Sequence, residues 1–316
     1  PYLSYFKEYV INKLVKNKPD LVGISLTAMS QVIPGFTLAD IIKQNLPDIK
    51  IVIGGVIPNH LSKKIKAQPK LFSLFDYLIK GEGETPLYKL CESIEGVISI
   101  DAVPNLIYFE KNAIYETQHL SIEDVNDLPT PDYDGFPLEK YLSPLPVLSI
   151  EPARGCYWRK CSFCNQYSIH GNTFRLRDPQ RIIVDIKRLQ SKYNAQLFNI
   201  SNEGVPVNHL SRISEALLES KLDIQWYAGA QLKKSFSKEV CNLLRSAGCR
   251  KLIFGLESGS RRILNLMNKS VILDEVPQIL RNCTKAGIKV HLYLIIGFPT
   301  ETLKEIEATQ DFILEA

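Results

Sequence analysis

The chain alternates short apolar, β-branched segments with segments of helical periodicity, and this alternation restricts the fold more than any other feature. DLVGISL (20–26) and IKIVIGG (49–55) have the composition of buried parallel strands, and residues 36–46 carry apolar side chains at helical spacing. LFDYLIKGEGET (74–85) indicates a further strand and TPLYKLCESI (85–94) a helix. This order predicts an α/β fold, with a small doubly wound, Rossmann-like domain over residues 1–95.

A second and more regular series of strands and helices begins at residue 146. The pattern predicts strands near 147–151, 197–201, 224–229, 251–255 and 290–296, and helices near 179–192, 207–220, 236–247, 273–286 and 302–315. Five consecutive β/α units predict part of a TIM-type barrel, a partial (β/α)6 barrel over residues 146–316. Residues 96–145 are rich in Pro and Asp and contain one hairpin pattern, so we expect a linker there.

Composition narrows the class of protein. The 316 residues are 45% hydrophobic and 23% charged, which is typical of a globular chain long enough for two cores. No apolar run approaches the roughly 20 residues that span a bilayer, and no signal-peptide pattern begins the chain, so we expect a cytoplasmic protein and no membrane partner. The chain starts with Pro1 and stops at Ala316 inside an expected helix, so we expect a fragment or a processed piece.

EPARGCYWRKCSFC (151–164) places three of the seven cysteines directly after the first expected barrel strand, where parallel barrels carry their catalytic groups. Seven unevenly spaced cysteines do not suit a disulfide scaffold and indicate thiols or metal ligands. One interpretation is a zinc site completed by Cys249 or His170. The pattern favours an iron–sulfur cluster, because four irons held by three thiolates leave one iron open to a substrate or cofactor.

RGCYWRKCSFCNQ resembles the cluster loop of the radical S-adenosylmethionine (radical SAM) superfamily, in the branch with an amino-terminal cobalamin-binding domain. The spacing here is CxxxxCxxC, one residue longer in the first gap than the usual CxxxCxxC. The resemblance implies a 4Fe–4S cluster bound by Cys156, Cys161 and Cys164, with S-adenosylmethionine (SAM) as the second cofactor. It also implies that Phe163 lies against the adenine of SAM.

Three later segments extend the resemblance: FNISNEGVP (198–206), KLIFGLESGSRRILNLMNK (251–269) and VHLYLIIGFPTET (290–302). They imply that Glu203 accepts hydrogen bonds from the methionine amino group of SAM. Glu257 and Ser258 would face the ribose and the methionine carboxylate, and Ile295 and Gly297 would lie against the adenine.

Two positions depart from the family pattern. Asn202 stands where the family carries Asp, and Gln231 stands where relatives commonly place Arg. One carboxylate is enough to meet an ammonium group, so binding of the methionine amino group would survive the first change. The second change puts contacts to a carboxylate of SAM or of the substrate in doubt.

The amino-terminal domain resembles the cobalamin-binding module in PDLVGIS, IVIGG and DYLIKGEGE. The resemblance implies that Ser25, Thr27, Gly54 and Gly55 line the nucleotide tail of cobalamin, with glycine allowing close backbone approach. The family's axial histidine, in an Asp-x-His-x-x-Gly loop, is not found in this sequence. His60, after GGVIPN, has the pattern of a surface-loop histidine and not of a cobalt ligand.

The activity implied by the resemblance is reductive cleavage of SAM to a 5′-deoxyadenosyl radical, or cobalamin-dependent methyl transfer to an unactivated carbon. The expected partners are a small-molecule or peptide substrate and a reductant such as flavodoxin or ferredoxin. Two alternatives are a non-catalytic cobalamin or SAM sensor and an enzyme that modifies transfer RNA. The net charge of +4 gives the nucleic-acid reading no support.

Overall fold

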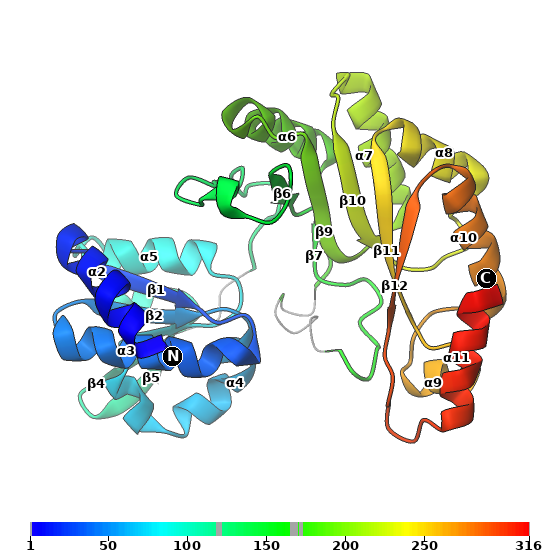
Figure 1. Ribbon diagram of the computed structural model, residues 1–316. Coiled ribbons are helices and arrows are strands. Elements are labelled where there is room, and N and C mark those ends of the chain that lie inside the picture. Colours follow the sequence, from blue (N-terminus) through cyan, green and yellow to red (C-terminus); the bar gives the residue numbers. More distant parts are fainter. Residues whose placement is uncertain (1, 118–121, 165–169, 171–172, 316) are drawn as a thin grey trace. The chain divides into compact units, whose positions relative to one another are not determined.

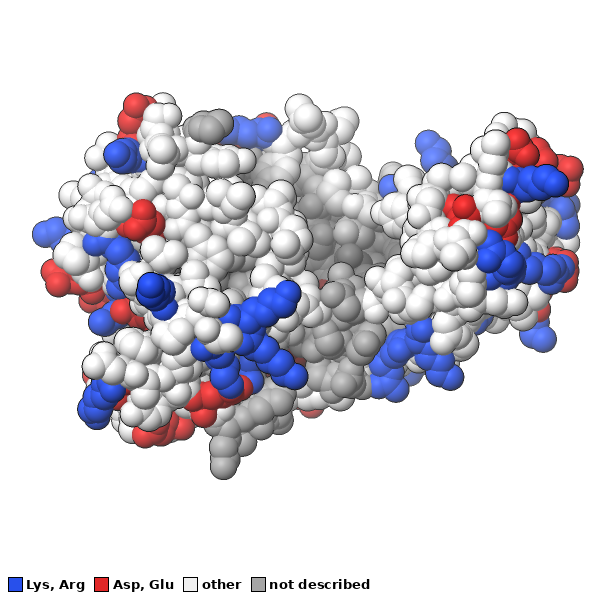
Figure 2. All heavy atoms as spheres, turned by 90° about the horizontal axis from the view of Figure 1, so that it is seen from below, with Lys and Arg blue, Asp and Glu red and all other residues white. Residues whose placement is uncertain are grey.

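The computed structural model describes residues 2–117, 122–164, 170 and 173–315, apart from the side chains of Ser201 and Glu203. The chain divides into two compact units, one of residues 1–123 with 168–171 and the other of residues 124–167 with 172–316. Each unit has its own sheet and its own hydrophobic core (Figure 1). On the face drawn in Figure 2, basic side chains are interspersed with acidic ones, in line with 38 basic and 34 acidic residues.

The first unit is built around a five-stranded sheet of order β1-β2-β3-β4-β5, in which β1 to β3 are parallel and β4 and β5 are antiparallel. Its elements are α1 (Tyr2–Tyr5), η1 (Phe6–Ile11), α2 (Asn12–Asn17), β1 (Leu21–Ser25), η2 (Met29–Gln31), α3 (Val32–Asn45), β2 (Lys50–Gly54), α4 (Val56–Lys66), η3 (Pro69–Ser73), β3 (Tyr77–Ile79), α5 (Glu84–Ile94), η4 (Ile100–Ala102), β4 (Leu106–Glu110) and β5 (Ala113–Glu116).

Alternation along β2 explains how this sheet is covered on both faces. Ile51 and Ile53 belong to one buried cluster with side chains of α3 and α4, whereas Val52 belongs to another with Leu90 of α5. Successive strand residues point to opposite faces, so a continuous apolar run is buried on both sides.

The hairpin expected in the linker extends the sheet of the first unit. Leu106 and Ile107 of β4 are fully buried and pair with β3 through Ile79 and Leu78. Residues 96–117 are therefore part of this unit's structure, and the first unit continues to Glu123 instead of ending near residue 95. The apolar side chains of β4 cover a strand edge and a core that the first three strands leave open, which composition alone did not indicate.

The second unit contains a five-stranded, wholly parallel sheet of order β12-β11-β10-β9-β6, with α6, α7, α8 and α10 along it in Figure 1. Its elements are η5 (Leu138–Lys140), β6 (Val147–Ile150), β7 (Ala153–Arg154), β8 (Arg175–Leu176), α6 (Pro179–Tyr193), β9 (Leu197–Val205), α7 (Val207–Ser220), β10 (Gln225–Ala230), α8 (Lys238–Ser246), β11 (Cys249–Glu257), α9 (Arg261–Leu266), η7 (Leu273–Glu275), α10 (Val276–Lys285), β12 (Lys289–Leu294) and α11 (Leu303–Glu315).

The five expected barrel strands are all present, and their order follows the chain. Phe198, Trp226 and Phe254 from three neighbouring strands are fully buried in one core. The α/β fold with a partial parallel barrel is thereby confirmed. Among the described residues, none of the helices has the length and apolar character needed to cross a bilayer.

Candidate functional site

The loop that carries the three cysteines begins and ends in a short antiparallel ladder. Ala153 and Arg154 of β7 pair with Leu176 and Arg175 of β8. Gly155 follows at once with φ +82°, and a Cβ atom there would overlap the carbonyl oxygen of Thr173. Glycine is required at this position because the backbone is left-handed and the opposite strand leaves no room. The ladder therefore fixes the base of the loop at the carboxyl end of β6.

Three hydrogen bonds attach the same loop to the last residue of α9 and the two residues that follow it, residues 266–268. Trp158 donates its indole N–H to the Asn268 carbonyl oxygen over 2.7 Å. The Ser162 backbone N–H donates to the Met267 carbonyl over 2.9 Å, and the Ser162 hydroxyl donates to the Leu266 carbonyl over 2.9 Å. Both stretches between the cysteines are thus held by one piece of backbone.

Cys156, Cys161 and Cys164 are free, half-buried thiols. Burial raises the pKa of Cys161, and the charges of Cys164 and Cys156 add to that rise, so the three sulfurs lie within electrostatic reach of one another. In the described part of the chain, no three His, Cys, Asp or Glu side chains gather closely enough to hold a single metal ion. A four-iron cluster does not require this, because it binds each thiolate to a different iron. The donor set therefore fits a cluster better than a single ion.

The two alternative zinc ligands are engaged elsewhere. Cys249 is fully buried in the core of the second unit, and burial raises the pKa of its thiol to about 12. His170 Nδ1 lies 2.8 Å from Glu82 Oε1 within the first unit. Cys249 therefore adds no fourth ligand to the cysteine loop.

The two positions that depart from the family pattern both support the cysteine loop. Asn202 donates its side-chain N–H groups to the carbonyl oxygens of Ala153 and Gly155, over 2.6 and 3.3 Å. Gln231 donates to Cys156 Sγ over 3.7 Å and accepts from the Ser270 hydroxyl over 3.2 Å. An amide supplies N–H donors here that a carboxylate lacks. The side chain of Glu203, expected to meet the methionine amino group, lies outside the described residues.

Glu257 ends β11 and forms a shielded ion pair. Its Oε1 lies 2.7 Å from Nζ of Lys269, and the two side chains are 9% and 14% exposed. The Glu257 backbone has φ +68°, a left-handed conformation that costs a non-glycine residue about 1 kcal/mol or more. Its carbonyl oxygen accepts from the Ile295 backbone N–H over 2.9 Å, which ties the ends of β11 and β12 together. The expected contact of Glu257 with SAM stays a prediction.

Ser258 is held by hydrogen bonds at the end of β11, and its expected contact with SAM stays a prediction. It is fully buried, its hydroxyl lies 3.2 Å from that of Thr309 in α11, and the Ser260 backbone N–H donates to it over 3.1 Å. This geometry makes Ser258 a support of the strand end. Phe163 is 42% exposed. Gly297 has φ +83° and donates its N–H to Glu301 Oε2. The expected contacts of these two residues with the adenine stay predictions.

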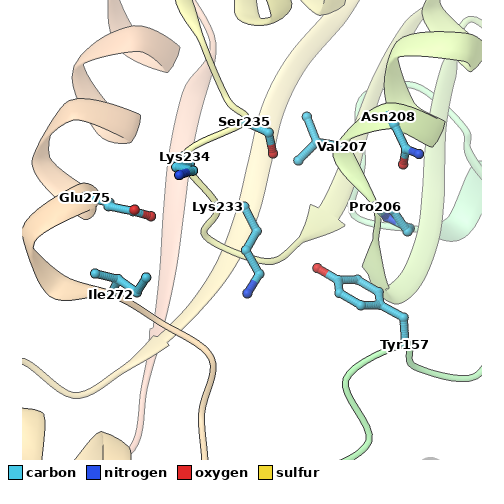
Figure 3. A pocket seen from close by; sticks show the side chains of 9 residues that line it. All are labelled: Tyr157, Pro206, Val207, Asn208, Lys233, Lys234, Ser235, Ile272 and Glu275. Carbon is cyan, nitrogen blue, oxygen red and sulfur yellow. The ribbon is translucent and has the colours of Figure 1, made fainter.

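A cavity of about 500 Å³ lies beside the cysteine loop, between the segments that follow β9, β10 and α9 (Figure 3). Tyr157 and Lys233 both point into it in Figure 3. Burial raises the pKa of Tyr157 to about 12 and lowers that of Lys233, whose Nζ donates to the carbonyl and hydroxyl oxygens of Ser270. Tyr157, which lines the cavity, directly follows Cys156 in the sequence. The cavity is large enough for a small organic molecule. The full lining is Tyr157, Pro206, Val207, Asn208, Lys233, Lys234, Ser235, Ile272 and Glu275.

In the first unit, the four residues expected to meet cobalamin gather at the carboxyl ends of β1 and β2. Ser25 and Gly54 are paired in register, and the Leu26 backbone N–H donates to the Gly54 carbonyl over 2.9 Å. Gly55 has φ +101°, and a Cβ there would lie 2.7 Å from the Leu26 carbonyl oxygen. The hydroxyl of Thr27 lies 3.0 Å from Gln31 Oε1. Strand ends that carry only glycine and small hydroxyl side chains fit a module that receives a nucleotide tail.

His60 lies on α4 and not in a surface loop as expected. Sequence reasoning also missed Lys269 and Thr309. Both lie in helical or post-helical segments whose polar residues look solvated in the sequence, and only the fold brings them to the end of β11.

Comparison with known proteins places these features in a family context. The model of the radical SAM superfamily matches residues 150–313, and the model of the B12 binding domain matches residues 3–90. The chain is 28% identical over 307 residues to an uncharacterised methyltransferase of Pyrococcus horikoshii, covering 96% of this chain and 66% of that protein. It is 28% identical over 285 residues to the hopanoid C-3 methylase of Methylococcus capsulatus, covering 88% and 53%. The chain thus spans less than two thirds of these relatives' length.

Two solved structures share the fold. The cobalamin-dependent S-adenosylmethionine radical enzyme OxsB, with aqua-cobalamin and S-adenosylmethionine bound, superposes with a TM-score of 0.76 at 20% identity, over 96% of this chain and 44% of that one. The radical S-adenosylmethionine methyltransferase TsrM of Kitasatospora setae, with cobalamin and a [4Fe-4S] cluster bound, gives 0.74 at 17% identity, over 99% and 63%.

Proposed function

The chain belongs to the radical SAM superfamily, and from this premise we propose that it is the core of a cobalamin-dependent radical SAM methyltransferase acting on an unactivated carbon. The expected cofactors follow from the two family matches: a 4Fe–4S cluster and SAM for the second unit, and cobalamin for the first. When bound, these groups supply electron transfer to SAM, a 5′-deoxyadenosyl radical and a transferable methyl group.

One observation carries the proposal. Three free thiols lie on a single loop that is fixed at the carboxyl end of a parallel sheet by β7, β8 and residues 266–268. In parallel barrels this end of the sheet carries the active site. Cys156, Cys161 and Cys164 are the residues that would hold the cluster.

The remaining residues of the site hold the cysteine loop and the end of β11 in place. Asn202 and Gln231 hold the loop through its backbone and through Cys156, so their departure from the family pattern is compatible with an intact cluster loop. The Ser258 hydroxyl and Thr309 fix the end of β11, where Glu257 would meet SAM. The cavity lined by Tyr157 and Lys233 is the proposed place for a small-molecule substrate, since it borders the loop and is partly apolar.

The reductant we propose is a flavodoxin or ferredoxin, and the proposed compartment is the cytoplasm. All seven cysteines are free thiols, which suits a reducing compartment.

The test is analysis of SAM-derived products by mass spectrometry after anaerobic cluster reconstitution, with a strong reductant and with or without methylcobalamin. We expect 5′-deoxyadenosine, and S-adenosylhomocysteine only when cobalamin is present. The Cys161→Ala variant, treated identically, is the background control. If the chain shows an iron–sulfur spectrum but forms neither product, the proposal that this chain is catalytic is wrong.

A further inference from the structure

Lys269 is a shielded positive charge at the end of β11. Its Nζ lies 2.7 Å from Glu257 Oε1, and its backbone N–H donates to the Leu264 carbonyl over 3.0 Å. Gly255 faces the pair, and a Cβ there would lie 2.7 Å from Lys269 Nζ and would collide with Glu257. The strand therefore leaves space for this ion pair, which fixes the ammonium group in one place.

The same segment carries the cysteine loop. Residues 266–268 supply the three carbonyl oxygens that bind Trp158 and Ser162, and Lys269 is the next residue along the chain. The Lys269 Nζ also lies 5.9 Å from the ring centroid of Phe163, the residue before Cys164, within the range of a cation–π contact. The lysine and the cysteines are thus held by a single short backbone.

The ammonium group of Lys269 lies close to the cysteine loop, because its Nζ is 5.9 Å from the ring centroid of Phe163, the residue that precedes Cys164. A charge that is only 14% exposed is screened far less than one on the surface.

We propose that Lys269 is a positioning residue that raises the reduction potential of the cluster held by the cysteine loop, and that Glu257 limits this effect. Reduction adds one negative charge to the cluster, so a fixed ammonium group nearby stabilises the reduced form. The Glu257 carboxylate offsets part of the positive charge. This inference rests on the proposed function, because it requires Cys156, Cys161 and Cys164 to hold the cluster.

The experiment is a redox titration of the anaerobically reconstituted full chain without SAM, followed by the EPR signal of the reduced cluster. Lys269→Met should shift the midpoint potential to more negative values, whereas Lys269→Arg should keep the wild-type value. Glu257→Gln should shift it in the opposite direction, to more positive values. Lys251→Met is the matched control, since it removes a lysine about 20 Å away at the other end of the same strand.

Opposite shifts of the midpoint potential in the two variants distinguish an electrostatic effect from a change in packing. If Lys269→Met and Glu257→Gln shift the potential in the same direction, or if neither shifts it beyond the Lys251→Met control, the inference is wrong. If Lys269→Met assembles no cluster, Glu257→Gln decides alone: a more positive potential supports the inference, and an unchanged or more negative one overturns it. Failure of the wild-type chain to assemble any cluster would instead overturn the proposed function.

Discussion

The hydroxyl of Thr309 accepts a hydrogen bond of 2.8 Å from the backbone N–H of Gly259. Thr309 lies on α11, and Gly259 lies two residues after the end of β11. The same hydroxyl contacts Ser258, and it donates back to the Glu305 carbonyl of its own helix over 2.9 Å. A single buried side chain of α11 thus fixes the strand end on which Glu257 and Ser258 are presented.

Replacement of Thr309 by Val keeps the shape and removes the hydroxyl. The part-buried Gly259 N–H then has no acceptor from this side chain, and the loss of such a hydrogen bond costs about 1 kcal/mol. We expect a loss of unfolding free energy of that size in urea titrations, and weaker SAM binding by calorimetry on reconstituted protein. Thr284→Val is the control, because its exposed hydroxyl bonds only to carbonyls of its own helix. Equal effects of the two variants would contradict the assigned role of Thr309.

Replacement of Gly155 by Ala tests the base of the cysteine loop. The left-handed backbone costs an alanine about 1–2 kcal/mol, and the collision with Thr173 adds to this. Gly96→Ala provides a matched comparison, since Gly96 also has a left-handed backbone, at φ +77°, and no atom within 4 Å of the added carbon. We expect Gly155→Ala to lower the iron content after reconstitution and to be the more destabilised variant in thermal unfolding. A wild-type iron content in Gly155→Ala would show that the loop tolerates displacement of its base.

Single replacement of Cys156, Cys161 or Cys164 by Ala should abolish cluster assembly, measured as iron and sulfide content and as visible absorption. The proposed cluster needs all three thiolates, and the loop offers no further cysteine that could replace a lost ligand. Cys91→Ala removes an exposed thiol of α5 in the first unit and should assemble a wild-type cluster. An intact cluster spectrum in any of the three loop variants would refute the ligand assignment.

His209 makes the stability of the chain sensitive to acid. Burial lowers the pKa of His209 below its ordinary value of 6.5, and the charge of Arg212 acts in the same direction. As the pH falls below 6.5, the unfolded chain takes up a proton that the folded chain still refuses, so stability decreases.

We therefore expect the melting temperature of His209→Gln to fall less than that of the wild type when the pH is lowered from 7.5 to 5.5. His291→Gln removes an exposed histidine of the same unit and should follow the wild-type curve. Parallel curves for wild type and His209→Gln would contradict this prediction.

The sequence predicted the features that repeat along the chain and the motifs that lie within one segment. The apolar run in IKIVIGG determines a parallel strand locally, because burial on both faces demands an unbroken apolar run. The three cysteines were found for a similar reason, since all three lie within one short loop. The place of these residues at strand ends follows from the β/α alternation.

Contacts between distant segments could not be predicted in this way. Lys269 meets Glu257 only because α9 and its following turn fold back over the end of β11, and periodicity contains no information on that path. The contact of Ser258 with Thr309 is of the same kind, because a serine next to a motif glutamate gives no sign that a helix some fifty residues later packs against it. β7 and β8 have two residues each, too few for any alternating pattern.

The β7–β8 ladder has a consequence for how the protein matures. The pairing of Ala153 and Arg154 with Leu176 and Arg175 brings the two ends of the cysteine segment together through the backbone, so folding itself meets the entropy of closing that segment. Small zinc domains, by contrast, remain unfolded until metal arrives. We therefore expect the folding of this chain to depend less on its cluster than the folding of a small zinc domain depends on its metal.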